Sequence, residues 1–572
     1  MRTVLAAALL AVVLLAGCSG LSAPDAGNAT ATAVDGTNAT TTGDGAGETT
    51  PDDEAAATTA NDGAAGSATD AGDGTAADRL GEGPPDPPTD RLGWEAGVWH
   101  NESIAVDNSD GMNASERRVA VARAMARVEY VRQLEFGTNG TIPISVRSRE
   151  EFRNRTLGEG TNHSEAVRTF ENGKFEAAFL VGDDEDALAA QRTNRAATTG
   201  GYYDLRNDSI VLISDTGRPQ FDGEETLAQE VGHALLDTRF NVTAMRQSVE
   251  TRDGLNGQNG LIEGDGNLID ERYMERCGDE WECIPQPEGS NALGGGAGDV
   301  HIGINMMRYF PYSDGPTFIE YHYDRGGWDR IDAMYEDPPV SAEQIIYPGA
   351  YPDERPTNVT LRDATSADWE RVRPDDRPAR ETLGQSVITT MFAYTWFDAD
   401  YRRRGIGVVD REDFLHIENG QVDTQGDLFD YDIPYSDGWD GDTLHVYART
   451  GVNDTNATRA GGTNGTPVTV SGDDRATDDG PETAYVWRIE WESRSEATEF
   501  VDGYRALLRY WGGQRVPDRD GVWRIDDEAS PFTDAYAVRQ SGTTVTLVNA
   551  PTVADLPDVS DTVAAPAASA SG

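Results

Sequence analysis

The large apolar residues of this chain are concentrated between residues 93 and about 550, and this contrast decides which part can fold. Residues 19–92 are mainly Ala, Thr, Gly, Asp, Ser and Pro, so they cannot bury enough apolar surface to offset the entropy lost on folding. We expect a disordered stalk there. We also expect an exposed polar insertion at about 450–480 and a low-complexity tail at 551–572. The sequence therefore predicts a folded region over 93–550.

The charge of the chain indicates its environment. Acidic residues number 100 against 47 basic ones, the net charge is −53, and Lys174 is the only lysine. An acidic, lysine-poor composition keeps a protein soluble at high salt, where repulsion between charges is screened over short distances. The alternative, an acidic disordered protein, conflicts with the many Trp, Tyr and Phe residues. We expect a halophilic protein, and its charge disfavours nucleic acid and anionic membrane surfaces as partners.

The N-terminus, "MRTVLAAALLAVVLLAGCSG", predicts export. Its apolar run is too short for a comfortable membrane span and suits a signal peptide over residues 1–18. The residues "LAGC" resemble a lipobox, which implies that Cys18 is lipidated and anchors the mature chain to the membrane. The alternative is an ordinary cleaved signal with an incidental cysteine. We therefore predict a lipoprotein on the extracellular face of the cell membrane.

Two further cysteines, Cys277 and Cys283, lie in "CGDEWEC". In an oxidising compartment two thiols at this spacing can close a short loop. They could instead bind a metal, but no second Cys or His pair lies nearby in the sequence. We favour the disulfide.

The folded region has an α+β pattern. Apolar spacing predicts helices at 114–136, with Ser115 as N-cap, and at 260–276, 381–397 and 495–511. β-Branched and aromatic runs predict a strand at 141–148, two strand segments within 200–214, and strands at 484–491, 521–525 and 543–550.

One helical segment, "ETLAQEVGHALLD" at 224–236, carries candidate chemistry. Gln229 and His233 are four residues apart and project from the same side, with Glu230 between them. Two histidines at that spacing can hold Zn²⁺, and the intervening glutamate is the general base that deprotonates metal-bound water. Here glutamine replaces the first histidine. A surface acid and a half-buried histidine are the simpler interpretation of the tetrapeptide alone.

A second helical segment, "GLIEGDGNLIDERYMERC", follows about thirty residues later and contains Glu263 beside glycines. A carboxylate on a second helix that packs across the first is the third ligand of one class of zinc peptidases. Small neighbours let two helices approach closely. The alternative is a glutamate at a helix start followed by flexible glycines.

Together these segments resemble gluzincin-type metallopeptidases, whose signature is His-Glu-x-x-His on one helix and Glu-Gly-x-Ala on the next. The resemblance continues in "YFPYSDGPTFIEYHYDRGGWDRIDAMYEDPPVSAEQIIYPGAYPDERP" (309–356), "GWDGD" (438–442) and "VWRIEWESRSEATEFVDGY" (486–504), and so covers roughly 110–550. It implies a zincin-like fold with a strand-rich N-terminal part and a helical C-terminal part. The whole chain also resembles lipobox-bearing surface proteins of halophilic archaea.

Carried over to matching positions, the resemblance implies that His233 and Glu263 are zinc ligands and Glu230 is the general base. Gln229 takes the first ligand position, where its amide oxygen is a much weaker zinc donor than imidazole. Tyr347 stands where the family has histidine; its hydroxyl could still donate a hydrogen bond to an oxyanion. No spacing argument selects a replacement ligand, although His301 or His322 could approach in three dimensions.

Three functions follow from these residues. The first is a catalytically degenerate metallopeptidase homologue with a binding or cell-envelope role and a peptide or surface protein as partner. The alternative is an active extracellular zinc peptidase that uses Glu230 as base. A third is a solute-capturing lipoprotein, which the stalk and anchor would suit. Zinc is the cofactor that the resemblance implies, and the two departures argue against tight zinc binding.

Overall fold

The computed structural model describes residues 87, 89–137, 140–158, 163–204, 207–221, 223–285, 300–398, 401, 407–418, 421–422, 428–450 and 481–563. The expected signal peptide, the lipidation at Cys18, and nearly all of the stalk and insertion lie outside the described residues, as does the end of the tail. No helix in the described ranges is long and apolar enough to cross a membrane.

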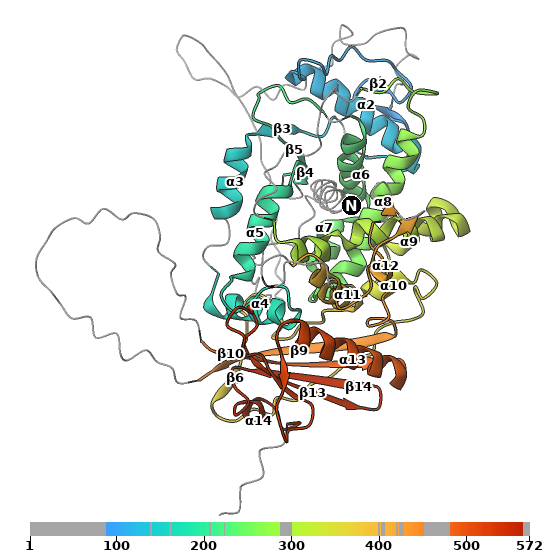
Figure 1. Cartoon of the computed structure of the whole chain (residues 1–572). Helices are drawn as coiled ribbons and strands as arrows, with labels where there is room; N and C mark the ends of the chain where they lie inside the picture. Colours follow the sequence, from blue (N-terminus) through green and yellow to red (C-terminus); the bar gives the residue numbers. More distant parts are fainter. Residues whose placement is uncertain are drawn as a thin grey trace, which may run out of the picture.

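The largest sheet is antiparallel and lies at the C-terminal end of the chain (Figure 1). Its strand order is β11-β12-β13-β14-β10-β9-β6. The bounds of the strands, in sheet order, are Gln514–Arg515, Val522–Arg524, Ala535–Ser541, Thr544–Ala550, Thr483–Trp491, Trp439–Arg449 and Trp369–Arg371. The long central strands β9 and β10 flank the insertion expected at 450–480, and they pair from Trp439–Trp491 to Ala448–Thr483.

Both faces of this sheet are covered, as the consecutive buried residues Ala484–Trp487 of β10 show. Helix α13 (Arg494–Tyr510) buries Phe500 and Tyr504 in the main core beside Trp487. Helix α14 (Leu556–Val559) belongs to a separate cluster on the opposite face, with Val486. Residues 551–563, expected to be part of a tail, thus include a helix that closes the second face of the sheet.

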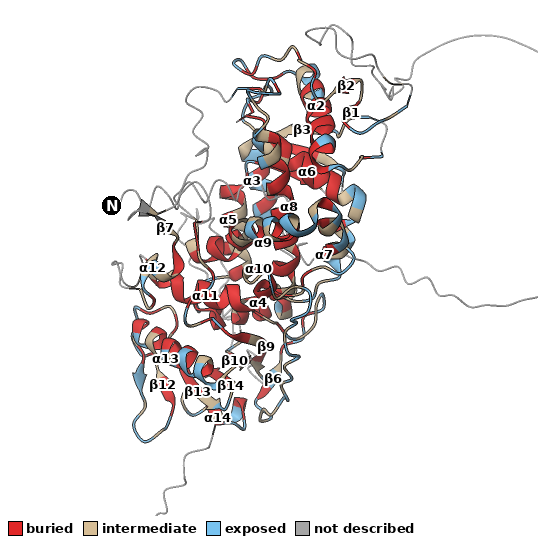
Figure 2. Cartoon of the chain, turned by 90° about the vertical axis from the view of Figure 1, so that its right-hand side faces the viewer, coloured by how far each residue is buried: buried red, intermediate tan, exposed pale blue. Residues whose placement is uncertain are grey.

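The remainder of the described chain is mostly helical. The longer helices are α2 (Ala114–Arg132), α4 (Glu165–Ala177), α5 (Ala187–Thr198), α6 (Glu225–Phe240), α8 (Arg252–Met274) and α9 (Ile302–Met334). The shorter ones are α3 (Arg149–Gly158), α7 (Val242–Gln247), α10 (Ala342–Ile346), α11 (Gln385–Ala393), η3 (Tyr394–Trp396) and α12 (Arg411–Phe414). Figure 2 shows that α6, α8 and α11 are buried along most of their length. Helix α9 is interrupted at Gly327, whose φ is 62°.

Helix α8 begins at Arg252, eight residues before the expected start at 260. The stretch "GLNGQNG" has poor helix propensity, but its glycines face other chain segments at very short range. A Cβ on Gly257 would lie 2.8 Å from the Ser341 backbone, and one on Gly260 would lie 2.7 Å from Cγ1 of Ile345. Tertiary packing therefore overrides propensity here, and Glu263 lies inside the helix instead of at its start.

A smaller sheet of three strands precedes α6 in the chain, in the order β3-β5-β4. Strand β3 (Ile144–Arg147) is parallel to β5 (Ser209–Ile213), and β4 (Gly201–Asp204) is antiparallel to β5 and lies at the edge. The remaining strands form two short pairs, β1 (Trp94–Glu95) with β2 (Val98–Trp99) and β7 (Ile417–Glu418) with β8 (Gln421–Val422).

The structure is mixed α and β, but two further details of the prediction were wrong. The main sheet is formed by residues 369–550, so the C-terminal part, and not the N-terminal part, is strand-rich. Helix α2 is capped by Asn113, and not by Ser115. The Asn113 side chain accepts from the backbone N–H of Glu116, whose carboxylate in turn accepts from the N–H of Asn113.

Candidate functional site

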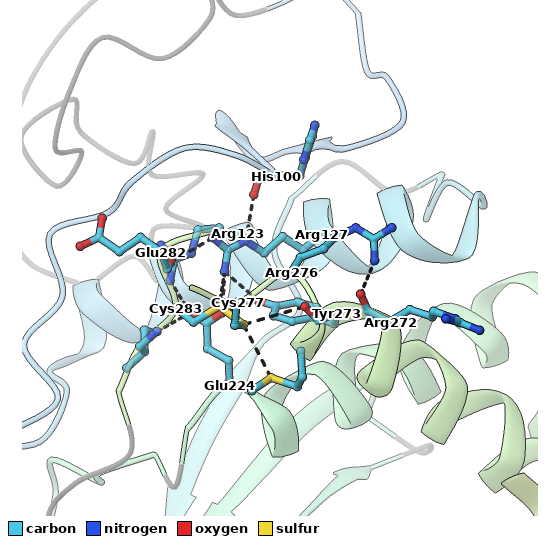
Figure 3. Close-up of a disulfide and its surroundings, with 12 residues drawn as sticks. His100, Arg123, Arg127, Glu224, Arg272, Tyr273, Arg276, Cys277, Glu282 and Cys283 are labelled. Carbon is cyan, nitrogen blue, oxygen red and sulfur yellow. Dashed lines mark hydrogen bonds and ion pairs between the residues drawn. A yellow bond between two sulfur atoms is a disulfide. The ribbon is translucent and has the colours of Figure 1, made fainter. Parts of the chain in front are cut away.

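The start of α6 is fixed by a buried charge network around Glu224 (Figure 3). Its carboxylate pairs with Arg123 and, at 2.6 Å, with Arg127, and it accepts a hydrogen bond from the Tyr273 hydroxyl at 2.6 Å. The two arginines come from α2 and the tyrosine from the end of α8. Because all these side chains are buried, the network holds α6 against both neighbouring helices.

The disulfide favoured from the sequence joins Cys277 and Cys283 directly after α8. It lies against this network, since Arg127 stacks over Trp281 at 4.7 Å and donates to the Glu282 carbonyl at 3.1 Å (Figure 3). Although Glu224 is close to both sulfurs, sulfur engaged in a disulfide is not a thiolate metal ligand.

Helices α6 and α8 bring His233 and Glu263 together, as the resemblance implied. The Nε2 atom of His233 lies 3.2 Å from Oε2 of Glu263, and both side chains are almost fully buried. Burial alone would lower the pKa of His233, but the Glu263 carboxylate outweighs it and raises that pKa. The imidazole also rests on Gly266, where a Cβ would lie 3.0 Å from His233 Cε1.

The third residue of the motif, Glu230, lies on the same buried helix face but has a different partner. Its Oε2 accepts a hydrogen bond of 2.7 Å from the backbone N–H of Tyr203 in the edge strand β4. Burial raises the pKa of Glu230 to about 8, while His233 opposes the shift and Glu263 adds to it. A carboxyl group with this pKa titrates close to neutral pH.

Sequence reasoning missed a buried cation beside these carboxylates. Arg246 of α7 is 3% exposed, and burial lowers its pKa to about 10, an effect that the negative charge of Glu263 opposes. The guanidinium also opposes protonation of His233. Nothing in the spacing of the motif indicates Arg246, since α7 is a separate short helix and its approach to α8 is a tertiary feature.

The remaining expected ligands are not assembled into a metal site. Gln229 is half-buried. His301 caps α9 by accepting from the Ile304 N–H at 3.2 Å, and His322 Nδ1 accepts from Arg330 Nε at 3.0 Å. Within the described ranges, no third His, Cys, Asp or Glu brings a ligand atom within 4.8 Å of both His233 and Glu263.

Tyr347 is also engaged elsewhere. Its hydroxyl donates to Asp432 Oδ1 at 2.7 Å and accepts from Gln385 Nε2 at 3.1 Å. None of the contacts described for Tyr347 in the structured ranges reaches Glu230, His233 or Glu263. The tyrosine therefore joins α10 to α11 and to the chain that leads into the large sheet.

The fit of this site to zinc can be judged from its donors. Two donor atoms on one tetrahedral zinc lie about 3.3 Å apart, so the 3.2 Å between His233 and Glu263 would allow a shared ion. A structural or catalytic zinc needs three or four protein donors, however, and the only further donor that the motif offers is the amide oxygen of Gln229. Both ring nitrogens of His233 and Oε2 of Glu263 lack a hydrogen-bond partner, but with only two strong donors and with Arg246 nearby the residues do not fit a resident zinc ion.

Comparisons with known proteins bear on another part of the chain. Residues 370–560 match the model of a domain of unknown function, DUF8575, which covers nearly all of the seven-stranded sheet and α11–α14. No curated protein matches the chain. No solved structure matches it either. The match leaves α6, α8 and the His233–Glu263 pair outside the family segment.

Proposed function

We propose that this chain is a surface-anchored protein of a halophile that keeps the two motif helices of a gluzincin-type metallopeptidase but has lost zinc catalysis. Its role is then binding, with a peptide or a surface protein as partner, or maintenance of the cell envelope. The observation that carries the proposal is the direct 3.2 Å pair of His233 and Glu263, with no third strong ligand among the residues that the structure describes.

The charges around the pair support the same conclusion. The Glu263 carboxylate favours the charged form of His233, and Arg246 adds a positive charge next to the pair. A divalent cation would have to displace the proton of His233 and approach a guanidinium in a buried site, which Coulomb repulsion opposes. The pair then serves to hold α6 against α8.

Zinc content tests the proposal. We expect the wild-type protein, purified and dialysed at high salt, to contain much less than one zinc per chain by elemental analysis. Gln229→His should raise the zinc content, because it restores a second imidazole one turn from His233. Gln247→His is the matched control, since it adds a histidine at an exposed position at the end of α7. One tightly held zinc in the wild-type protein would refute the proposal.

The active peptidase remains the second candidate because the His233–Glu263 distance equals that of two ligands on one zinc within about 0.1 Å. It requires chelator-sensitive cleavage of peptides and loss of that cleavage in Glu230→Gln. If peptides are cleaved by the wild type but equally by Glu230→Gln, the cleavage comes from a contaminant.

A further inference from the structure

Away from the motif helices, three carboxylates from distant parts of the chain meet where α4 packs on the large sheet. One oxygen each of Glu176, Asp183 and Asp534 lies within 4.8 Å of the other two. Glu176 ends α4, Asp183 follows it, and Asp534 immediately precedes β13. Glu176 and Asp534 are buried, while Asp183 is exposed, so the cluster opens to solvent on one side.

The cluster has little positive charge against it: Arg524 acts electrostatically on Asp534, but its ion pair is with Asp526. Within the described ranges, none of the three carboxylates forms an ion pair with Arg, Lys or His. Burial, and the other two carboxylates, raise the pKa of Glu176 far above its ordinary value. Burying negative charge without a partner is costly, so either protons or a cation must neutralise the site.

Asn549 of β14 is a separate sign that favours a cation. Its side chain is fully buried and reaches the cluster, where Nδ2 donates to Asp534 Oδ2 at 2.8 Å. Its carbonyl oxygen, Oδ1, has no hydrogen-bond partner, and neither does Oε1 of Glu176. A proton shared between two carboxylates would leave Oδ1 of Asn549 without a partner. A metal ion, in contrast, can take both Oδ1 of Asn549 and Oε1 of Glu176 as ligands.

We propose that Glu176, Asp183, Asp534 and Asn549 form a binding site for a divalent cation of calcium size. All donors are oxygens, which suits hard cations and not zinc. Four side chains leave room for water ligands on the side where Asp183 is exposed, and calcium takes six to eight oxygens in flexible geometry. We expect the site to bind calcium weakly, in the affinity range of extracellular calcium modules.

The position of the site gives the cation a structural role. Asp534 and Asn549 belong to the segment matched by the family of unknown function, and Glu176 and Asp183 come from outside it. The same contact is formed by Phe179, which meets Phe532 edge to face at 4.9 Å between ring centroids, and by the Asp183 N–H, which donates to the Pro531 carbonyl at 3.0 Å. The bound cation therefore fastens α4 to the large sheet (Figure 1).

Terbium luminescence, excited through the surrounding tyrosines, and calcium competition test the site at constant high salt. We expect one saturable Tb³⁺ site per chain that Ca²⁺ displaces, and a melting temperature that calcium raises. Asp183→Asn should weaken the affinity about ten-fold or more, because it removes a charged ligand from the exposed side of the site. Asp184→Asn is the matched control: the next residue is equally exposed and lies outside the cluster.

Asp534→Asn provides a second variant, which should lose calcium binding while circular dichroism confirms that it is folded. Equal binding by the Asp183→Asn and Asp184→Asn proteins would overturn the proposal. So would a wild-type protein whose melting temperature responds to pH but not to calcium, because the carboxylates would then be neutralised by protons.

Discussion

His233 on α6 and Glu263 on α8 form a buried pair with 3.2 Å between Nε2 and Oε2. The contact lies between two helices that both pack in the main core, and Gly266 leaves room for the ring, because a Cβ there would lie 3.0 Å from Cε1 of His233. If the pair is structural, its removal should lower stability and leave the rest of the fold intact.

Glu263→Ala should destabilise the protein by about 3–5 kcal/mol, because it leaves the His233 imidazole buried without its partner. The measurement is the free energy of unfolding by denaturant at constant salt. Glu271→Ala, an exposed position on the same helix, is the control and should change stability by less than about 0.5 kcal/mol. Equal effects of the two substitutions would show that the buried pair contributes nothing.

Glu171 should make the protein sensitive to acid. Burial opposes ionisation of this residue, but Lys174 and Arg377 outweigh it and lower its pKa to about 2. Because the folded pKa lies below the unfolded value, the resulting stability is complete above about pH 4.5 and is lost as the pH falls toward 2. Glu171→Gln should therefore destabilise strongly at pH 7 and much less near pH 2.

The comparison requires unfolding curves of both proteins across that pH range. A stability difference that does not change with pH would contradict a lowered pKa of Glu171 in the folded protein.

Lys174 is the only lysine of the chain. The Lys174→Arg variant therefore tests in addition whether the small ammonium group is needed beside Glu171 and Glu381.

Gly264→Ala should destabilise by about 1–3 kcal/mol or more, because its Cβ would meet the backbone oxygen of Gly315 at 2.2 Å and force α8 from α9. Gly232→Ala, also inside a helix, is the matched control. Its Cβ would make an ordinary contact of 3.5 Å with Ile269, so the better helix propensity of alanine should stabilise by up to about 1 kcal/mol. Melting temperatures of the two variants should therefore move in opposite directions.

Removing the disulfide should have a moderate effect, because Cys277 and Cys283 enclose a short loop with a sequence separation of six. The chain-entropy relation gives about 2 kcal/mol for a loop of this size. The double substitution to serine, measured by denaturation without reductant, should lose about that amount. An unchanged stability would mean that the Arg127–Glu224 network already holds this segment in place.

Local patterns in the sequence were enough to predict several elements. Strands β3, β12 and β14 and the strand pair β4–β5 fall within the ranges predicted from apolar spacing and β-branched runs, and α13 and β10 each begin one residue before theirs. These elements are encoded by residues that are near each other in sequence, so periodicity and turn residues carry the information. The Cys277–Cys283 pair could be proposed for the same reason, since its spacing is short.

Contacts between distant residues decided the rest. Sequence spacing placed Gln229, Glu230 and His233 on one helix, but only packing shows that Tyr203 contacts Glu230 and that Arg246 lies beside Glu263. The carboxylates at 176, 183 and 534 are also brought together by tertiary structure. Helix periodicity fixes which way a side chain points, whereas its neighbours depend on how helices and sheets pack, and a local pattern does not contain that information.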